Sequence, residues 1–381
     1  MRKVVILGND HTNTLGLTQT LGLSGYYCIA LLWGNKRDLV KSSKFCKKIY
    51  SAKSPEACIE VLLSTEYGKD GVAIPIIATC DSAALALEAY NDKLKGRFVF
   101  EYASKDYSLH QLMEKKLQVQ LATDTGFNVP KSWTISNFDN IPSDLIYPCL
   151  IKPLVSCKGA KDDIRVCKDE NEYRKNLHSL KYTTEVLIQQ YIDRDFEISI
   201  LGCGLSTGEV IIPAVENKLT LFPKYVGLEC LARMNKLTDL TIIKAITNLV
   251  HKIGYVGVFS VEMMHCKADN KFYFTEINLR NDGANSFVYK YGVNLPLNHV
   301  EDLTGLPITK FNNFNPGYYI WDMHHFMSVA HFDINIWQWI KELWQSKGFL
   351  TYFKEDKAPF YKQYVNFILN KLHLRKNEEY C

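Results

Sequence analysis

The stretch VFSVEMMHCKADNKFYFTEINLR, residues 258–280, decides the fold of this chain. Two apolar runs flank a short polar segment at 268–270, which predicts a hairpin of strands 256–265 and 271–279. Because side chains alternate along a strand, Glu276, Asn278 and Arg280 share one face. Two oxygen donors and a guanidinium on an otherwise apolar strand indicate a site for a metal ion and a phosphate group.

The register of this hairpin decides where Glu262 points, and the sequence leaves two registers open. A two-residue turn at 269–270 places Glu262 and Glu276 on opposite faces, where each would pair with surface lysines. A three-residue loop at 268–270 sets them directly opposite, with Cβ atoms about 5 Å apart. Two carboxylates that close repel each other unless a cation lies between them, and a divalent cation such as Mg²⁺ would serve.

The first hundred residues have a different pattern from the hairpin region. Short apolar strands at 4–7, 28–33 and 74–79 alternate with helical stretches, which predicts parallel strands in a Rossmann-like layer. A dinucleotide site would require G-x-G-x-x-G after the first strand, but only Gly8 and Gly16 occur there. This spacing argues against a dinucleotide-dependent oxidoreductase.

The predicted fold class is therefore α/β followed by α+β, in four parts. We predict a Rossmann-like domain at 1–105, a small subdomain at 106–188, a large subdomain with the metal site at 189–310 and an aromatic-rich extension at 311–381. One amphipathic helix is expected over 108–126. The tryptophans of the extension are expected to be packing residues; they are Trp337, Trp339 and Trp344.

Composition excludes several classes of function. The 381 residues carry 45 basic and 41 acidic side chains, and the net charge of +4 comes without a dominant basic tract, so nucleic-acid binding is not indicated. No run approaches the ~18 apolar residues of a transmembrane span. The eleven cysteines include no C-x-x-C pair, which predicts reduced thiols and a cytoplasmic location.

Two further segments have features of a nucleotide site. Lys152 lies near the end of an apolar strand, and a loop of small residues at 156–160 follows it. Small residues let backbone N–H groups approach phosphate oxygens, and lysine adds a positive charge. The strand 186–192 runs into a short connection that ends at Glu197, where backbone groups could bind adenine and the carboxylate could bind ribose.

In this order and spacing the chain resembles the ATP-grasp superfamily over about residues 1–310. The most specific part is Glu262 followed by E-x-N-x-R at 276–280, and the pairing of 151–153 with 189–192 comes next. Glu114 and Lys115 precede a "G-x-x-V-P" stretch at 126–130, and 291–296 is similar to the family's closing helix. The phosphate loop is poorer in glycine than in many members, and Gln189 replaces an acidic hinge residue.

The resemblance implies a nucleotide held between two subdomains. Lys115, or the adjacent Lys116, and Lys152 would bind phosphates, and Ser156 and Lys158 would belong to a lid over them. The residues implied at adenine and ribose are Gln189, Gln190, Tyr191, Ile192 and Glu197. The residues implied at Mg²⁺ or Mn²⁺ are Glu262, Glu276 and Asn278. Arg280 and Lys152 would act on the transferred phosphoryl group.

The implied reaction is ATP-dependent activation of a carboxylate as an acylphosphate, which an amine then attacks. The implied partners are a small carboxylate and an amine, or a peptidoglycan or polysaccharide precursor, in an enzyme that could be a homodimer. Candidate substrate residues are Lys218, Arg233, Asn281, Asp282 and Asn285. The rival hypothesis is a non-catalytic ATP-binding regulatory module, which the intact metal and arginine positions disfavour.

Overall fold

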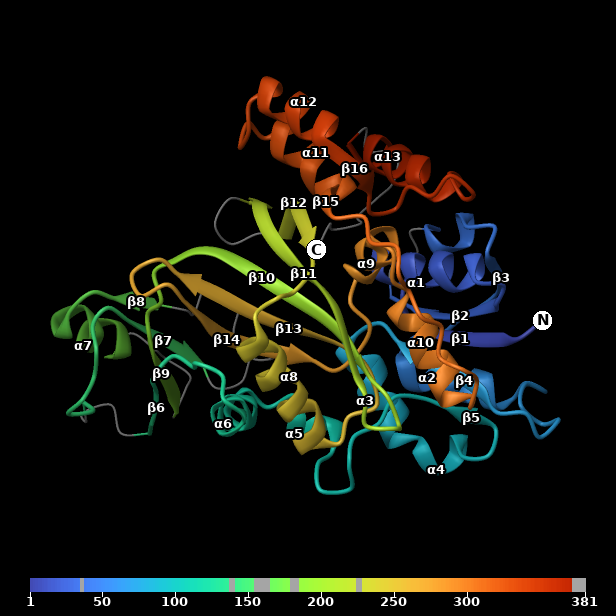
Figure 1. Ribbon diagram of the computed structural model, residues 1–381, viewed down its shortest axis with the longest axis horizontal. Helices are drawn as coiled ribbons and strands as arrows, with labels where there is room; N and C mark the ends of the chain where they lie inside the picture. Colours follow the sequence, from blue (N-terminus) through green and yellow to red (C-terminus); the bar gives the residue numbers. More distant parts are fainter. Residues whose placement is uncertain (35–37, 137–140, 154–164, 179–184, 224–227, 372–381) are drawn as a thin grey trace.

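The computed structural model describes all residues except 35–37, 137–140, 154–164, 179–184, 224–227 and 372–381. The described part contains a five-stranded, a four-stranded and a seven-stranded sheet (Figure 1). The five-stranded and four-stranded sheets lie at opposite ends of the molecule, and the seven-stranded sheet lies between them. Among the described residues, no helix combines the length and apolar character that crossing a bilayer requires.

The N-terminal sheet is parallel, as the alternation of strands and helices predicts. Its order is β3-β2-β1-β4-β5. The strands are β1 (Lys3–Asn9), β2 (Tyr27–Trp33), β3 (Cys46–Ser51), β4 (Ile74–Ala78) and β5 (Phe98–Val99). The helices are α1 (Thr12–Leu23), the 3₁₀ turn η1 (Val40–Ser42), α2 (Pro55–Leu63), α3 (Asp81–Ala89) and α4 (Asn91–Leu94). The strand order reverses between β1 and β4, and at such a point the strands' carboxyl ends open a ligand-binding crevice.

The four-stranded sheet is antiparallel, with the order β6-β9-β7-β8. Its elements are β6 (Ser132–Ile135), β7 (Cys149–Pro153), β8 (Arg165–Cys167), α7 (Glu170–His178) and β9 (Val186–Gln190). The single helix expected over 108–126 is wrong, because the chain forms α5 (Leu109–Leu112) and then α6 (Lys115–Thr125). A capping box at Ser108 and Gln111 starts α5, and α6 restarts after Glu114, so Lys115 is the first residue of a helix.

The seven-stranded sheet has the order β14-β13-β10-β11-β12-β15-β16. Its strands are β10 (Arg194–Gly204), β11 (Val210–Phe222), β12 (Leu228–Asn235), β13 (Gly257–Cys266), β14 (Lys271–Asn278), β15 (Gly317–Ile320) and β16 (Ser346–Phe349). The helices α8 (Leu240–Ile253), α9 (Asn285–Tyr291) and α10 (Leu295–Leu303) accompany it. An Asp239 cap begins α8, which ends at Gly254 with φ +57°, and its apolar face is buried in the main core.

The hairpin of β13 and β14 follows neither of the two simple registers. Cys266 pairs with Lys271, so four residues form the loop, and a bulge at Thr275 then shifts the register. Beyond the bulge Glu262 lies directly opposite Glu276. The bulge has a packing reason: Phe274 and Ile277 are both buried in the main core although they are three residues apart. The extra residue lets both side chains reach the core and turns Glu276 to the face of Glu262.

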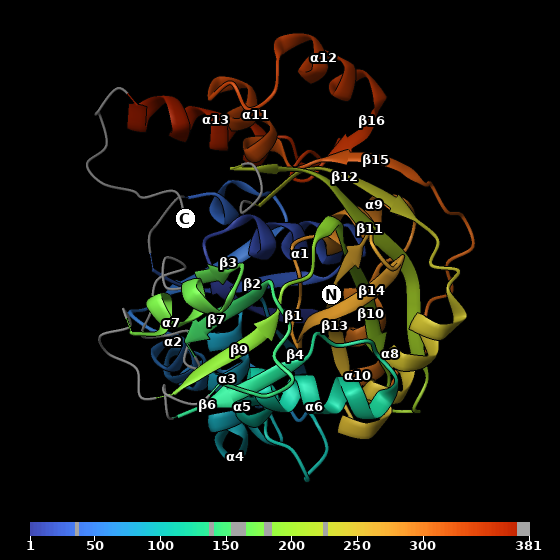
Figure 2. The ribbon, with the colours of Figure 1, turned by 90° about the vertical axis from the view of Figure 1, so that its left-hand side faces the viewer.

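The C-terminal extension adds β15 and β16 to the sheet and then three helices, α11 (Asp322–Ala330), α12 (Ile336–Gln345) and α13 (Ala358–Lys371). These helices lie together at one end of the molecule, beyond β12 and β15 (Figure 2). Asp356 fixes the extension to the N-terminal domain, because its carboxylate accepts hydrogen bonds from Ser43 Oγ at 2.5 Å and Gln19 Nε2 at 3.1 Å. The packing role expected for the tryptophans is wrong for Trp337 and Trp344, which are 78% and 91% exposed.

Candidate active site

A row of polar side chains crosses four strands of the large sheet. Glu276 pairs with Glu262, Glu262 with Ser199, and Ser199 with Glu216, so these residues lie side by side on β14, β13, β10 and β11. Residues directly opposite each other in a sheet share a face. The opposite face carries Val261 and its apolar neighbours into the core beneath α8. The residues predicted to bind the metal, Glu262 and Glu276, therefore lie on the face away from α8.

Lys218 supplies a positive charge to this row. Its Nζ lies 2.6 Å from Glu262 Oε2 and 2.8 Å from Glu229 Oε1, and only 8% of its side chain is exposed. Burial alone would lower the pKa of Lys218, but the carboxylates of Glu229, Glu262 and Glu216 outweigh it and raise the pKa. Lys218 is therefore a fixed cation at this site.

Burial has the opposite effect on the neighbouring carboxylic acids. It raises the pKa of Glu262, and the adjacent ammonium of Lys218 offsets part of this rise. Burial and the charge of Glu229 raise the pKa of Glu216 well above its ordinary value. Glu216 contacts Trp321 Nε1 at 3.5 Å and is almost fully buried. Carboxylates crowded and desolvated in this way gain stability when a further cation binds beside them.

Lys152 faces the row from the small sheet. Its Nζ donates a hydrogen bond to Gln189 Oε1 at 2.7 Å, which joins β7 to β9. Burial, and to a smaller extent the charge of Lys115, lower the pKa of Lys152, the charge of Glu276 opposes both effects, and the resulting pKa is about 8. Lys115 and Glu276 therefore both lie within electrostatic reach of Lys152. Helix α6 packs against β14, and charges from both of these elements act on the ammonium group of β7.

Helix α6 is fixed to strand β14 by a reciprocal pair of hydrogen bonds. Gln118 Nε2 donates to the carbonyl of Ile277 at 2.9 Å, and the N–H of Ile277 donates to Gln118 Oε1 at 3.2 Å. Because both contacts use the backbone of Ile277, they fix the strand next to Glu276 and Asn278. They also fix the helix that begins at Lys115.

Arg280 lies two residues beyond the end of β14, where a network of polar contacts holds its side chain. Its Nε donates to Asp81 Oδ1 at 2.9 Å, and its terminal nitrogens contact Asn278 Oδ1 at 3.2 Å and Asp282 Oδ2 at 3.5 Å. Ser260 Oγ donates to Asp282 Oδ2 at 3.1 Å. These contacts hold the guanidinium in one orientation beside the metal residues, as a group that must stabilise a transferring phosphate requires.

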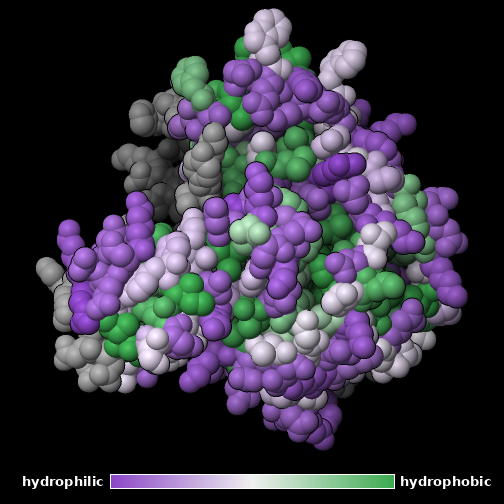
Figure 3. Space-filling view, turned by 60° about the vertical axis from the view of Figure 1, so that its left-hand side comes forward, coloured by the Kyte–Doolittle hydropathy of each residue, from purple (hydrophilic) through white to green (hydrophobic). Residues whose placement is uncertain are grey.

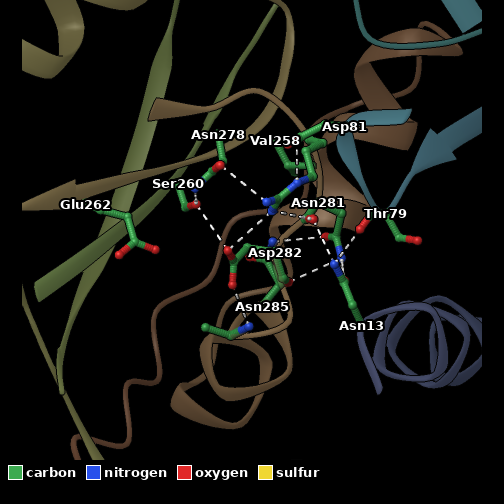
Figure 4. Close-up of polar contacts among 12 residues, drawn as sticks. Asn13, Thr79, Asp81, Val258, Ser260, Glu262, Asn278, Asn281, Asp282 and Asn285 are labelled. Carbon is green, nitrogen blue, oxygen red and sulfur yellow. Dashed lines mark hydrogen bonds and ion pairs between the residues drawn. The ribbon is translucent and has the colours of Figure 1, made fainter. Parts of the chain in front are cut away.

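Three asparagines connect the segment that follows β14 to the N-terminal domain (Figure 4). Asn281 Nδ2 donates to Asn13 Oδ1 at 2.5 Å, and Asn285 Nδ2 donates to Asn281 Oδ1 at 2.9 Å. Asn13 Nδ2 donates to the carbonyl of Thr79 at 2.8 Å. Asn13 follows β1 and Thr79 follows β4. The segment after β14 therefore reaches the parallel sheet between β1 and β4, where the order of its strands reverses. The candidate substrate residues Asn281, Asp282 and Asn285 thus lie where this strand meets the N-terminal domain, and Asn281 and Asn285 are buried there.

The remaining predicted residues are placed as follows. Gln189 is buried, and Gln190 Oε1 accepts a hydrogen bond from the N–H of Lys131 at 3.3 Å. Tyr191 and Ile192 continue from β9, and Glu197 forms an ion pair with Arg194. Ser156 and Lys158 fall outside the described residues. Lys116 follows Lys115 in the first turn of α6.

Arg233 is not brought to the row. It pairs with Asn217, whereas Glu216 and Lys218 pair with the residues on either side of it, so its side chain leaves the other face of the sheet. There its guanidinium lies 5.6 Å from the ring centre of Tyr318. Position along the chain could not show which face of the sheet Arg233 occupies, because that face depends on the register of β12 with β11.

Several site residues escaped the sequence reasoning. They are Asn13, Asp81, Ser199, Glu216, Glu229 and Ser260. Asn13 and Asp81 had a usable signal, because each follows a strand that flanks the reversal of strand order. The glutamates of β11 and β12 had none, since only the pairing of those strands shows which residues face β13.

The donor set fits a magnesium ion bound together with a nucleotide. Among the described residues, no group of three or more His, Cys, Asp and Glu side chains could hold a metal ion by itself. Mg²⁺ commonly takes only one or two protein carboxylates and completes its shell with phosphate oxygens and water. Glu262 and Glu276 in register, with Asn278 two residues further along β14, match this requirement.

Comparison with known proteins agrees with this geometry. Residues 120–286 match the family described as the ATP-grasp domain. The predicted resemblance to the ATP-grasp superfamily and the predicted fold class are confirmed. The matched segment includes Lys152, Glu262, Glu276 and Arg280.

Among the curated relatives, formate-dependent phosphoribosylglycinamide formyltransferase from Nitratiruptor sp. is 25% identical over 213 residues, 53% of either chain. The enzyme of the same name from Wolinella succinogenes is 25% identical over 205 residues, 52% of this chain and 51% of that one. This chain spans about half the length of these relatives.

Among solved structures, N5-carboxyaminoimidazole synthetase from Staphylococcus aureus matches with a TM-score of 0.67 at 14% identity. The match covers 87% of this chain and 86% of that chain. Biotin carboxylase from Campylobacter jejuni has a TM-score of 0.63 at 16% identity, with coverages of 83% and 74%. At these identities the likeness shows a shared fold.

Proposed function

We propose that this protein is an ATP-dependent carboxylate–amine ligase. One observation carries the proposal: Glu262 and Glu276 lie directly opposite each other on one sheet face, and the charge of Glu276 reaches the Lys152 ammonium. When bound, ATP would supply the phosphoryl group that activates the carboxylate, and Mg²⁺ would offset its charge. Glu262, Glu276 and Asn278 are the residues we assign to the metal.

The chain's own residues would then position the reactants and balance charge. Lys115 and Lys152 neutralise phosphate charge, and Gln189 orients Lys152 through its hydrogen bond. Arg280, held by Asp81 and Asn278, stabilises the phosphoryl group during transfer. Residues 189–192 line the adenine site and Glu197 binds ribose. The acceptor amine binds near Asn281, Asp282 and Asn285.

The proposal extends to the setting of the reaction. We assign the enzyme to the cytoplasm and its substrates to small carboxylates and amines, including precursors of peptidoglycan or other polysaccharides. Because two curated relatives are named formate-dependent, formate belongs in the first panel of carboxylates. A homodimer is the proposed oligomeric state, and light scattering after gel filtration tests it.

Release of ADP tests the reaction class. The protein with Mg²⁺ and ATP is mixed with pairs from a panel of carboxylates (formate, bicarbonate, amino acids) and amines. We expect ADP and phosphate to appear only when an acceptable carboxylate is present. Tight ATP binding without turnover on a wide panel would instead favour a non-catalytic regulatory module.

The structure gives a physical reason to set aside the oxidoreductase alternative. Gly16 lies inside α1, where a Cβ atom would meet Ser286 Oγ at 2.0 Å, so this glycine allows α1 to pack closely against α9. Gly8 is part of β1. Neither glycine forms the phosphate-binding turn of a dinucleotide site. We expect no change in melting temperature on adding NAD or NADP.

A further inference from the structure

Helix α12 carries an apolar face that nothing in the described chain covers. Ile336, Trp337, Ile340 and Trp344 recur at the three- and four-residue spacing of one helix face, and each of these residues is exposed. Trp337 and Trp344 are the most exposed tryptophans of the chain, and Phe332, in the turn before the helix, is 92% exposed. Apolar side chains clustered on one face mark an interaction surface.

The opposite face of α12 packs against α11. The helix is therefore held in one orientation, with its apolar stripe toward solvent. Glu342 is buried and lies 2.7 Å from His325 Nε2 on α11. Trp339 stacks on the same imidazole, with 6.0 Å between ring centres. Asn335 caps the helix by accepting a hydrogen bond from the N–H of Gln338. These contacts fix which residues point outward.

Lysines outnumber acidic residues among the exposed charges of the described part of the extension. The only acidic residue of α12 is Glu342, which points inward, whereas Lys341 stays exposed at the margin of the apolar stripe. Across the described residues 331–369, the exposed lysines outnumber the exposed acidic residues. The exposed lysines are Lys341, Lys347, Lys354 and Lys357, and the exposed acidic residues are Asp333 and Glu355.

We propose that α12 docks this protein onto an anionic lipid bilayer, with the helix lying in the plane of the headgroups. Tryptophan and isoleucine would enter the boundary between headgroups and acyl chains, and flanking lysines would meet lipid phosphates. The helix stands at the outer rim of the molecule, where pale and green side chains project into solvent (Figure 3). An anionic surface would meet Lys341, at the margin of the stripe, and the excess of exposed lysines over residues 331–369 with opposite charge.

Vesicle sedimentation tests the proposal with the full chain. Wild-type protein is mixed with vesicles of phosphatidylcholine alone or of phosphatidylcholine with phosphatidylglycerol, at low and at moderate salt. We expect binding to the mixed vesicles, weaker binding at the higher salt, and a blue shift of tryptophan emission. The double variant Trp337→Ser/Trp344→Ser should bind at least tenfold more weakly. Both side chains are exposed, so the variant should keep the wild-type melting temperature.

A matched control removes two exposed apolar side chains outside the extension. Val72→Ser/Leu240→Ser changes residues that are 67% and 78% exposed, and it should bind vesicles as the wild type does. Failure of wild-type protein to bind the anionic vesicles would overturn the proposal, as would equal binding by the two double variants. Concentration-dependent dimerisation that Trp337→Ser/Trp344→Ser abolishes, without vesicle binding, would assign the face to a second copy instead.

Discussion

Raising the pH should weaken ATP binding because it removes the charge of Lys152. Burial and the nearby Lys115 hold the pKa of Lys152 at about 8, below the ordinary 10.5 of a lysine. The ammonium would be about 90% charged at pH 7 and about 10% charged at pH 9. If only the charged form binds phosphate well, the apparent dissociation constant of ATP rises by about tenfold over this range.

Nucleotide titration from pH 6.5 to 9.5, followed by calorimetry or by a fluorescent ATP analogue, measures this profile. Lys152→Arg is the matched control, because a guanidinium keeps its charge throughout the range. The variant should bind ATP with an affinity that changes little between pH 7 and 9. The reasoning fails if wild-type affinity is constant over these two pH units. It also fails if the arginine variant loses affinity in the same way.

Three further substitutions probe the site. Glu276→Gln should lower the rate of ADP release by at least about a hundredfold while the circular dichroism spectrum stays unchanged; normal turnover would remove Glu276 from the metal site. Lys218→Met leaves two buried carboxylates without their cation, and it should lower the free energy of unfolding by about 3 kcal/mol, as measured in urea; an unchanged midpoint would show that this ion pair contributes little. Asp81→Asn loosens the hold on Arg280, so kcat should fall about tenfold with little change in the KM for ATP, whereas a change confined to KM would place Arg280 in ground-state binding.

The same depressed pKa has a consequence for stability. The pKa of Lys152 is lower in the folded protein than in the unfolded chain, so at neutral pH the charged lysine destabilises the fold. This penalty is present below pH 8 and disappears as the pH rises from about 8 to the ordinary lysine value. Lys152 lowers stability at neutral pH and lies near the candidate phosphate site. Selection for binding, rather than for folding, would retain such a residue.

Much of the fold could be predicted from local patterns. The apolar run of β1 and the alternation of strands with helices indicated the parallel sheet, and the apolar stretches around 268–270 indicated the β13–β14 hairpin. These signals are local, because the burial of a strand or of one helix face determines the pattern of apolar residues within a short stretch of sequence. The motif at 276–280 likewise predicted that Glu276 and Asn278 lie on one strand, and Arg280 follows the end of that strand.

Other features depended on contacts between segments far apart in the chain. The sequence left the direction of Glu262 open, and the bulge at Thr275 settled it because Phe274 and Ile277 both pack into the core. Strand pairing brought Lys218 to Glu262 and turned Arg233 to the other face. A bulge or a register shift moves a side chain across the sheet without changing the hydrophobic pattern by which the strand is recognised.

The sequence by itself determined which residues could bind a metal ion and phosphate, because that capacity belongs to carboxylate, amide, ammonium and guanidinium groups. Only the tertiary structure decided which of them meet, since α6 packs against β14 and the charge of Glu276 reaches Lys152 of β7 only in the folded chain. It also decided that Trp337 and Trp344 face solvent. An amphipathic helix can bury either face, and the pairing of Glu342 with His325 selected the one that points inward.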